Sequence, residues 1–327
     1  MTAPYGAVGL DGNSVAVLSS DGVLVFDANG TPAAAETVLN EIRALTKQPI
    51  RYLVYSHWHW DHWYGGEVYK KAFPNLEIIA HEKTREIMAG PAIAFNKPGL
   101  ESQLPDYIGS IEQRIATGEK STPPAADLPA LREALEDARF FLDQKRGVSH
   151  TLPTRTFRDR LDLTIGERQV QILNYGRAVT PGDALMYLPK EHVLVIGDLV
   201  VNPITFALSS FPSEWVATLE KLDRIDADVI VTGHGEPLRD KSLLRATLEV
   251  FRILLSEGAA ARAQGLDADQ AKDATMPKLH DVMVKITGDV PARNAAFRTQ
   301  LVDWFLHRVY DELAGPLTDE IAPIPPR

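Results

Sequence analysis

The chain has 327 residues, 45% of them hydrophobic and 24% charged, which is the balance of a soluble globular protein. It contains no cysteine, and this excludes disulfides, thiolate zinc sites and cysteine nucleophiles. The formal net charge is -10 and the basic residues are scattered, so no nucleic-acid partner is expected. No apolar run approaches the roughly 18 residues that a membrane span needs. No signal peptide is visible, so the chain as given is interpreted as cytoplasmic, or as periplasmic if an export signal was removed.

Strand and helix signals alternate at the start of the chain. The β-rich runs NSVAVLSS and GVLVFDAN are separated by the turn pair Asp21-Gly22. Val38, Ile42 and Leu45 follow with the spacing of a helix. The run IRYLVYS is a predicted buried strand, and LEIIA and EKTREIM predict a further strand and a short helix.

Residues 91–150 interrupt this alternation. Two Pro/Gly-rich stretches, PAIAFNKPGLESQLP and GEKSTPPAADLP, predict breaks that flank two helical segments. The second segment, ALREALEDARFFLDQKR, places a row of apolar side chains on one helix face. A segment of this size has a thin core of its own. We therefore expect a helical insertion at 91–150 within a single domain that covers 1–327.

Strand signals return in TFRDRLDLTI, RQVQILNY, DALMYLP and HVLVIGD. A helix, SEWVATLEKLDRI, follows, and Ser213 is its expected N-cap. The strand DVIVTG then ends in Gly233-His234-Gly235, and the remaining elements are predicted to be helical.

One stretch, YSHWHWDHWYGG, carries the densest chemistry. His57, His59, Asp61 and His62 fall within six residues, directly after the predicted buried strand. Ligands commonly bind at such strand ends in α/β sheets. Imidazole and carboxylate are the ligands that zinc and similar cations select where thiolate is absent. The spacing predicts two neighbouring metals, with His57 and His59 facing one and Asp61 and His62 facing the other. For the interleaved tryptophans, packing is favoured over substrate contact.

This motif resembles the signature of the metallo-β-lactamase-fold hydrolases. TPGDALMYLPKEHVLVIGDLV looks like that family's middle region, and the resemblance implies that Asp198 bridges both metals. VIVTGHGEP looks like the closing motif, with His234 in the last ligand place. The implied fold is α/β, a four-layer αββα sandwich, and the implied metal ligands are His57, His59, Asp61, His62, Asp198 and His234.

One position departs from the family pattern. Val179 stands where family members carry a third histidine for the first metal, and valine cannot bind a metal. His81 and His150 are the nearest candidates to replace it, although ordinary structural roles are more common for each. Asp183 is interpreted as a supporting or turn residue. We therefore expect the second site (Asp61, His62, Asp198, His234) to be more strongly occupied than the first.

These observations favour a hydrolase that depends on zinc or another divalent metal. In this reading a water activated by the metal attacks a small ester, lactone or lactam, and Asp61 helps to orient it and to return a proton. Phe206 and Phe211 are expected to line the mouth of the site. The alternative is a degenerate, non-catalytic member of the fold that still binds metal. The expected partner is a small-molecule substrate, with neither nucleic acid nor membrane, and the oligomeric state stays open.

Overall fold

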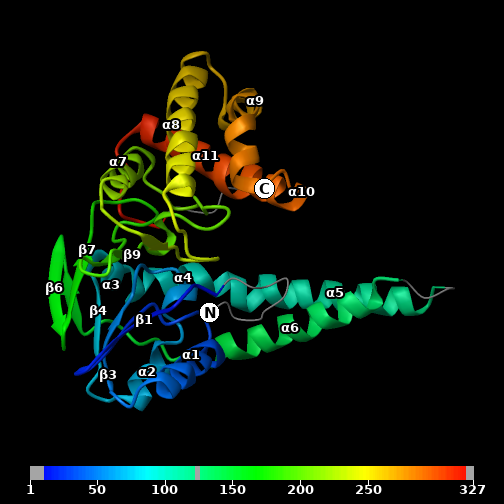
Figure 1. The fold of residues 1–327 in the computed structure, drawn as a ribbon. Coiled ribbons are helices and arrows are strands. Elements are labelled where there is room, and N and C mark those ends of the chain that lie inside the picture. The colour runs from blue at the N-terminus through cyan, green and yellow to red at the C-terminus, as the bar shows by residue number, and fades with distance from the viewer. Residues whose placement is uncertain (1–10, 122–125, 322–327) are drawn as a thin grey trace.

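The computed structural model describes residues 11–121 and 126–321. Within these residues two five-stranded sheets lie face to face and helices cover their outer faces (Figure 1). This is the αββα sandwich that the sequence predicts. None of the helices formed by the described residues is long and apolar enough to cross a membrane.

The first sheet is formed by the N-terminal part of the chain. β1 pairs antiparallel with β2, and the remaining neighbours are parallel. Its strands, in spatial order, are β1 Val15–Ser19, β2 Gly22–Phe26, β3 Ile50–Val54, β4 Glu77–His81 and β5 Arg155–Phe157. The helices that connect them are α1 Pro32–Leu45, α2 Gly66–Ala72 and α3 Glu82–Met88.

The second sheet follows in the C-terminal half. Its pairs are antiparallel except for β9 and β10, which are parallel and joined through α7. In spatial order the strands are β10 Val229–Val231, β9 Val193–Val195, β8 Leu185–Leu188, β7 Arg168–Leu173 and β6 Arg160–Ile165. α7 spans Pro212–Asp223.

Three layers of apolar side chains hold the sandwich together. Between the sheets, Leu24 and Phe26 of the first sheet meet Ile172 and Met186 of the second. A second layer lies under α1 and α2 on the outer face of the first sheet. A third lies between the second sheet and the helices α7, α8 and α11. Burial of this apolar area is the main favourable term in folding.

The C-terminal helices form a compact group above the second sheet (Figure 1). α8 packs against α7, α9 and α11. The helices are α8 Ser242–Ala263, α9 Ala268–Thr287, α10 Pro291–Ala296 and α11 Trp304–Ala314, with the π-helical turn Phe297–Asp303 between the last two.

The segment 91–150 is helical, and its two long helices project from the body as an antiparallel pair (Figure 1). A small core of Ile108, Ala138 and Leu142 lies between them. Its helices are α4 Pro91–Pro98, α5 Leu104–Glu119 and α6 Leu128–Arg146, with the π-helical turn Gly99–Gln103 between the first two. The break predicted over the first Pro/Gly-rich stretch is therefore wrong. Pro91 occupies the first turn of α4, where a missing N–H is tolerated, and Pro98 stands where α-helix gives way to π-helix.

The N-cap expected at Ser213 is also wrong. α7 begins one residue earlier at Pro212, and its cap position is Phe211, which makes no side-chain capping bond. The Ser213 hydroxyl donates instead to the Glu312 carboxylate of α11. Proline at the first helical position sets the backbone angle of the helix without a polar cap.

Phe251 offers a test of the outer core of the second sheet. It is fully buried on α8, stacked on Phe305 with ring centroids 4.3 Å apart and tilted against Trp215 at 4.6 Å. We expect Phe251→Ala to lower the free energy of unfolding by about 3–5 kcal/mol, because it removes apolar contacts and leaves a cavity. Leu45→Ala, at a side chain 72% exposed, is the control and should change it by less than about 0.5 kcal/mol. Urea denaturation measures both; equal effects would contradict the layer assignment.

Candidate metal centre

The residues singled out from the sequence meet at one edge of the sandwich, on loops that follow three strands. β3 ends at Val54, so the histidine run lies in the loop beyond it and not on the strand end, as the alternation argument assumed. Asp61 and His62 lie in a 3-10 turn, Trp60–His62. Asp198 lies in a second such turn, Gly197–Leu199, after β9, and His234 follows β10.

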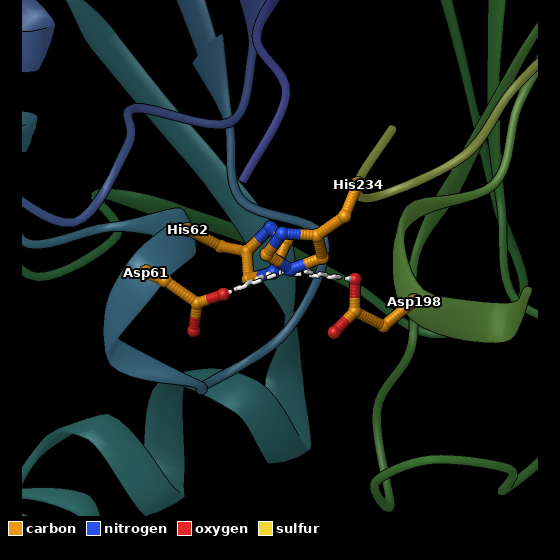
Figure 2. Close-up of side chains that lie close together, drawn as sticks. All are labelled: Asp61, His62, Asp198 and His234. Atoms are coloured by element: carbon orange, nitrogen blue, oxygen red, sulfur yellow. Dashed lines mark ion pairs between the residues drawn. The ribbon is translucent and has the colours of Figure 1, made fainter. Parts of the chain in front are cut away.

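Asp61, His62, Asp198 and His234 form the first of two groups that can hold a metal ion. Figure 2 shows the four side chains pointing toward one another from opposite sides of the site. Asp61 Oδ2 lies 3.2 Å from His62 Nε2 and 3.0 Å from His234 Nε2. Asp198 Oδ1 lies 3.4 Å from His62 Nε2 and 3.5 Å from His234 Nε2. Two carboxylates and two imidazoles thus converge on one point.

His57, His59 and Asp198 form the second group, whose candidate ligand atoms lie within 4.8 Å of one another. The two imidazole rings are 4.5 Å apart, edge to face. His57 Nε2 lies 3.7 Å from Asp198 Oδ2, the carboxylate oxygen that does not face His62. Asp198 therefore turns one oxygen to each group. Gly233 makes room for it, since a Cβ there would lie 1.9 Å from Asp198 Oδ1.

Several buried polar atoms at the centre of the site make no hydrogen bond within the described residues. These atoms are His57 Nε2, His62 Nε2 and Asp198 Oδ1. A buried polar atom without a partner is costly, and natural structures contain few of them. All three are good donors to a borderline cation such as zinc. The residues present therefore fit a divalent metal.

The charges of the site lead to the same conclusion. Burial opposes charge on His62, but Asp61, Asp198 and Asp27 outweigh it and raise the pKa of His62 well above its usual range. Burial likewise opposes charge on His234, while Asp198 and Asp61 raise its pKa to about 10. The buried carboxylates are thus stabilised by positive charge close by. A divalent cation can supply that charge in place of the two imidazole protons.

Asp27, at the end of β2, fixes the orientation of both histidine groups. Its carboxylate accepts from His62 Nδ1 at 2.8 Å, from the Ser56 hydroxyl at 2.8 Å and from the Ser56 N–H at 2.6 Å. Because the Ser56 hydroxyl donates to Asp27, it accepts from His57 Nδ1, 2.9 Å away. In their neutral forms, both imidazoles then have Nε2 free of a proton and directed into the site. Partners of this kind set the tautomer of metal-binding histidines.

The segment that precedes β1 connects the two halves of the site. The Gly12 N–H donates to Asp61 O, and the Asn13 N–H donates to Gly233 O. The Asn13 side-chain amide donates to Thr232 O and Gly235 O, on either side of His234. These bonds fix the position of the loop that carries Asp61 relative to the loop that carries His234.

The insertion reaches the site through its two ends. Phe95 of α4 meets Trp58 edge to face at 5.5 Å. In the last turn of α6, Lys145 Nζ lies 3.0 Å from the centroid of the Trp60 ring. Burial lowers the pKa of Lys145 to about 7, although Asp61 and Asp11 act in the opposite direction. The tryptophans of the motif thus pack against the insertion, as favoured above.

The proposed substitutes for the missing histidine belong to neither group. His81 caps α3 by accepting from the Lys83 N–H, and its ring lies against Phe157. His150 lies against the rings of Trp63 and Tyr64. His81 and His150 thus have the ordinary structural roles that the sequence favoured over metal binding. In the described residues the group with His57 and His59 therefore offers three candidate ligands and its neighbour four.

Val179 and Asp183 lie in the loop before β8. Val179 is buried in the core against α7 and α8. Asp183 accepts from the backbone N–H and the hydroxyl of Thr180, which shapes the loop, and burial raises its pKa to about 7. Each oxygen of its carboxylate thus accepts a hydrogen bond within the turn.

The two phenylalanines expected at the mouth differ. Phe206 lies 6.3 Å from the His59 ring and packs on Trp304. Phe211 is buried, with the Arg177 guanidinium over its ring, so the expectation that it lines the mouth is wrong. Phe211 is the N-cap residue of α7, and its side chain is buried in the core.

Three residues that shape the site were missed from the sequence: Asp27, Asn13 and Lys145. Asp27 follows a buried strand just as the histidine run does, and this placement could have marked it. The Asn13 side chain donates to backbone oxygens far along the chain, and Lys145 lies on the distant helix α6. Neither carries a signal in its local sequence.

Comparisons with known proteins agree with this picture. The family model of the metallo-beta-lactamase superfamily matches residues 7–234. A linear primary-alkylsulfatase of Pseudomonas sp. (strain ATCC 19151) is 29% identical over 266 residues, which is 76% of this chain and 47% of that protein. The chain thus spans about half the length of this curated relative.

Two solved structures share the fold. A stereoselective inverting sec-alkylsulfatase from Pseudomonas sp. matches with a TM-score of 0.61 and 17% identity, over 93% of this chain and 48% of that one. A metallo-beta-lactamase from Pontibacter korlensis matches with a TM-score of 0.51 and 20% identity, over 73% of this chain and 86% of that one. At these identities the likeness concerns the fold alone.

The role of Asp27 can be tested through metal affinity. We expect Asp27→Asn to weaken binding of a divalent metal about 10- to 100-fold, because an amide has one acceptor oxygen and must turn its NH2 group toward either the Ser56 N–H or the His62 ring and Ser56 hydroxyl. Asp21→Asn, at an exposed carboxylate, is the matched control. Competition with a chelator measures affinity, and circular dichroism verifies folding. A folded Asp27→Asn protein with unchanged affinity would refute the assignment.

Proposed function

Because the chain belongs to the metallo-β-lactamase superfamily, we propose that its paired clusters bind divalent metal, zinc in the first instance, and serve to hydrolyse an ester. One observation carries the proposal: Asp198 turns its two oxygens to two separate histidine groups. A hydrolase is supported by the family and by the alkylsulfatase relative. Burial of so many ionisable groups at one point does not stabilise the folded state, because buried charge is costly, and so the cluster indicates a function.

Six residues would hold the metal. Asp61, His62, Asp198 and His234 provide the ligands of one site, and His57, His59 and Asp198 those of the other. When bound, the metal supplies a water of lowered pKa and a Lewis acid that polarises the substrate oxygen. The four-ligand group is proposed to be the more strongly occupied, because the other has one ligand fewer.

Asp61 is the proposed catalytic residue. Its Oδ2 faces the imidazoles of His62 and His234, and those two groups hold its pKa below its usual range although burial opposes them. The carboxylate is therefore ionised and can accept a hydrogen bond from the attacking water. It can take the proton of that water as the water oxygen attacks, and then pass the proton to the leaving oxygen. Asp27 contributes by orienting the ring of His62.

The preferred substrate class is a sulfate ester of an aliphatic alcohol. The named activity of the curated relative suggests it, and so do the apolar side chains beside His59. Phe206 packs on Trp304 at 4.4 Å, and Phe95 packs on Trp58. An alkyl chain would be stabilised on such a surface by burial of apolar area. Carboxylic esters, lactones and lactams remain in the test as competitors.

The activity test uses purified protein loaded with zinc and assayed with dodecyl sulfate, p-nitrophenyl acetate, a simple lactone and a chromogenic lactam. We expect release of inorganic sulfate that stops on treatment with a chelator and returns with zinc. Asp61→Ala should lose both metal and turnover, because it removes a ligand and the proposed base. Turnover that survives removal of the metal would refute the proposal. Metal binding without turnover of any substrate would favour the non-catalytic alternative.

The unequal occupancy is tested at Val179. We expect about one tightly bound metal per chain in the native protein, because the group of His57, His59 and Asp198 has one ligand fewer than its neighbour and shares Asp198 with it. Val179→His should raise this to about two by restoring a third imidazole. Val195→His, a valine buried between the sheets, is the matched control and should add none. Metal analysis after dialysis against a weak chelator decides; two metals already held by the native protein would refute the inequality.

A further inference from the structure

Lys145 is an unusual lysine. It lies in the last turn of α6, it is only 8% exposed, and its ammonium forms no hydrogen bond or ion pair with the described residues. Lysine is rarely buried unless it is paired, because its charge loses hydration without compensation. A cation kept in such a position suggests an anionic ligand.

The position of the ammonium identifies the part of the site that it serves. It lies over the ring of Trp60, the residue directly before Asp61, and Phe141 and Tyr64 approach it at 4.7 and 5.5 Å. The carboxylates that act on its charge are those of Asp61 and Asp11. Asp11 in turn interacts with Asp61, Lys145 and His234. Lys145 thus belongs to the electrostatic neighbourhood of Asp61 and His234, beside the four-ligand group.

The aromatic rings alone do not account for this lysine. A cation–π contact attracts the charge but supplies no acceptor to the N–H donors of the ammonium. Asp11 Oδ1 accepts from the Gly30 N–H, and neither Asp11 nor Asp61 forms an ion pair with Lys145 in the described residues, although both act on its charge. A neutral side chain of the same length would pack against Trp60 and Phe141 without any cost of desolvation. The presence of an ammonium at this position therefore indicates a ligand with negative charge.

We propose that Lys145 is a specificity-determining residue that binds the anionic oxygens of the substrate, a tetrahedral oxyanion ester. The inference rests on the proposed function and deepens it. The outer oxygens of a sulfate monoester carry negative charge, and an ammonium donates to them in charge-assisted hydrogen bonds. A phosphate monoester has the same chemistry, whereas a neutral ester, lactone or lactam offers no such anion. The insertion would thus supply substrate charge recognition to a site built by the sandwich.

The first experiment compares three esters of one alcohol, p-nitrophenyl sulfate, phosphate and acetate, on the zinc-loaded protein. We expect Lys145→Met to lower kcat/KM for the preferred oxyanion ester on the order of 10- to 100-fold, mainly through KM, because a charged hydrogen bond is lost. Turnover of the acetate should not change, and Lys145→Arg should recover part of the loss. Lys221→Met is the matched control, since Lys221 also lies over an aromatic ring, that of Tyr175, but is exposed.

The second experiment measures binding without turnover. Titration calorimetry with inorganic sulfate, and separately with inorganic phosphate, should show that Lys145→Met weakens the tighter anion about 10- to 100-fold. Metal content and thermal midpoint should match those of the native protein. The tighter anion then identifies the ester class. If Lys145→Met folds poorly, Lys145→Gln, which keeps polarity without charge, replaces it in the same comparison.

The outcomes separate the two proposals. A purely structural Lys145 would lower the thermal midpoint when replaced and leave anion affinity and the ratio of oxyanion to acetate turnover unchanged; that result overturns the inference. The same holds if the native protein binds neither anion. If it binds one through Lys145 but hydrolyses no ester, the anion site stands and the proposed function fails.

Discussion

The buried carboxylate of Asp27 is the interaction on which the arrangement of the site depends. It holds His62 directly and His57 through the hydroxyl of Ser56. Because both rings use Nδ1 for these bonds, both present Nε2 to Asp198. Asp27 adopts a left-handed backbone conformation, with φ of 63°, which aspartate tolerates better than most residues. This turn lets a residue at the end of β2 reach the loop after β3.

The remainder of the centre depends on joining two sheets at one edge. Asp61 and His62 follow the first sheet, whereas Asp198 and His234 follow the second. The segment before β1 connects the two sides, because Gly12 donates to Asp61 O and Asn13 bonds on both sides of His234. Gly233 leaves space for the Asp198 carboxylate. The apolar layer between the sheets sets their separation, so packing far from the site fixes the distances within it.

The segment 91–150 packs on this scaffold. Its long helices project from the body, but Phe95 and Lys145 at its two ends rest on the tryptophans of the histidine run. Trp60 therefore has two neighbours of different origin, the candidate ligand Asp61 in its own turn and the ammonium of Lys145 on α6. Variable segments that meet a rigid site in this way commonly carry specificity.

Local patterns predicted the strands and the cluster of His57, His59, Asp61 and His62, whereas the αββα sandwich and the places of Asp198 and His234 followed from the resemblance of three motifs to a known family. Apolar runs mark the strands, and the candidate ligands stand in short motifs directly after them, so His57 could be named from the residues and Asp198 and His234 from the resemblance. Only the tertiary structure decided that Asp198 faces both groups, that Asp27 sets the tautomers and that Lys145 stands beside Asp61. The errors at Phe211 and Ser213 have the same origin. Which way a side chain turns, and which distant residue meets it, depends on packing between elements, and no local periodicity records that.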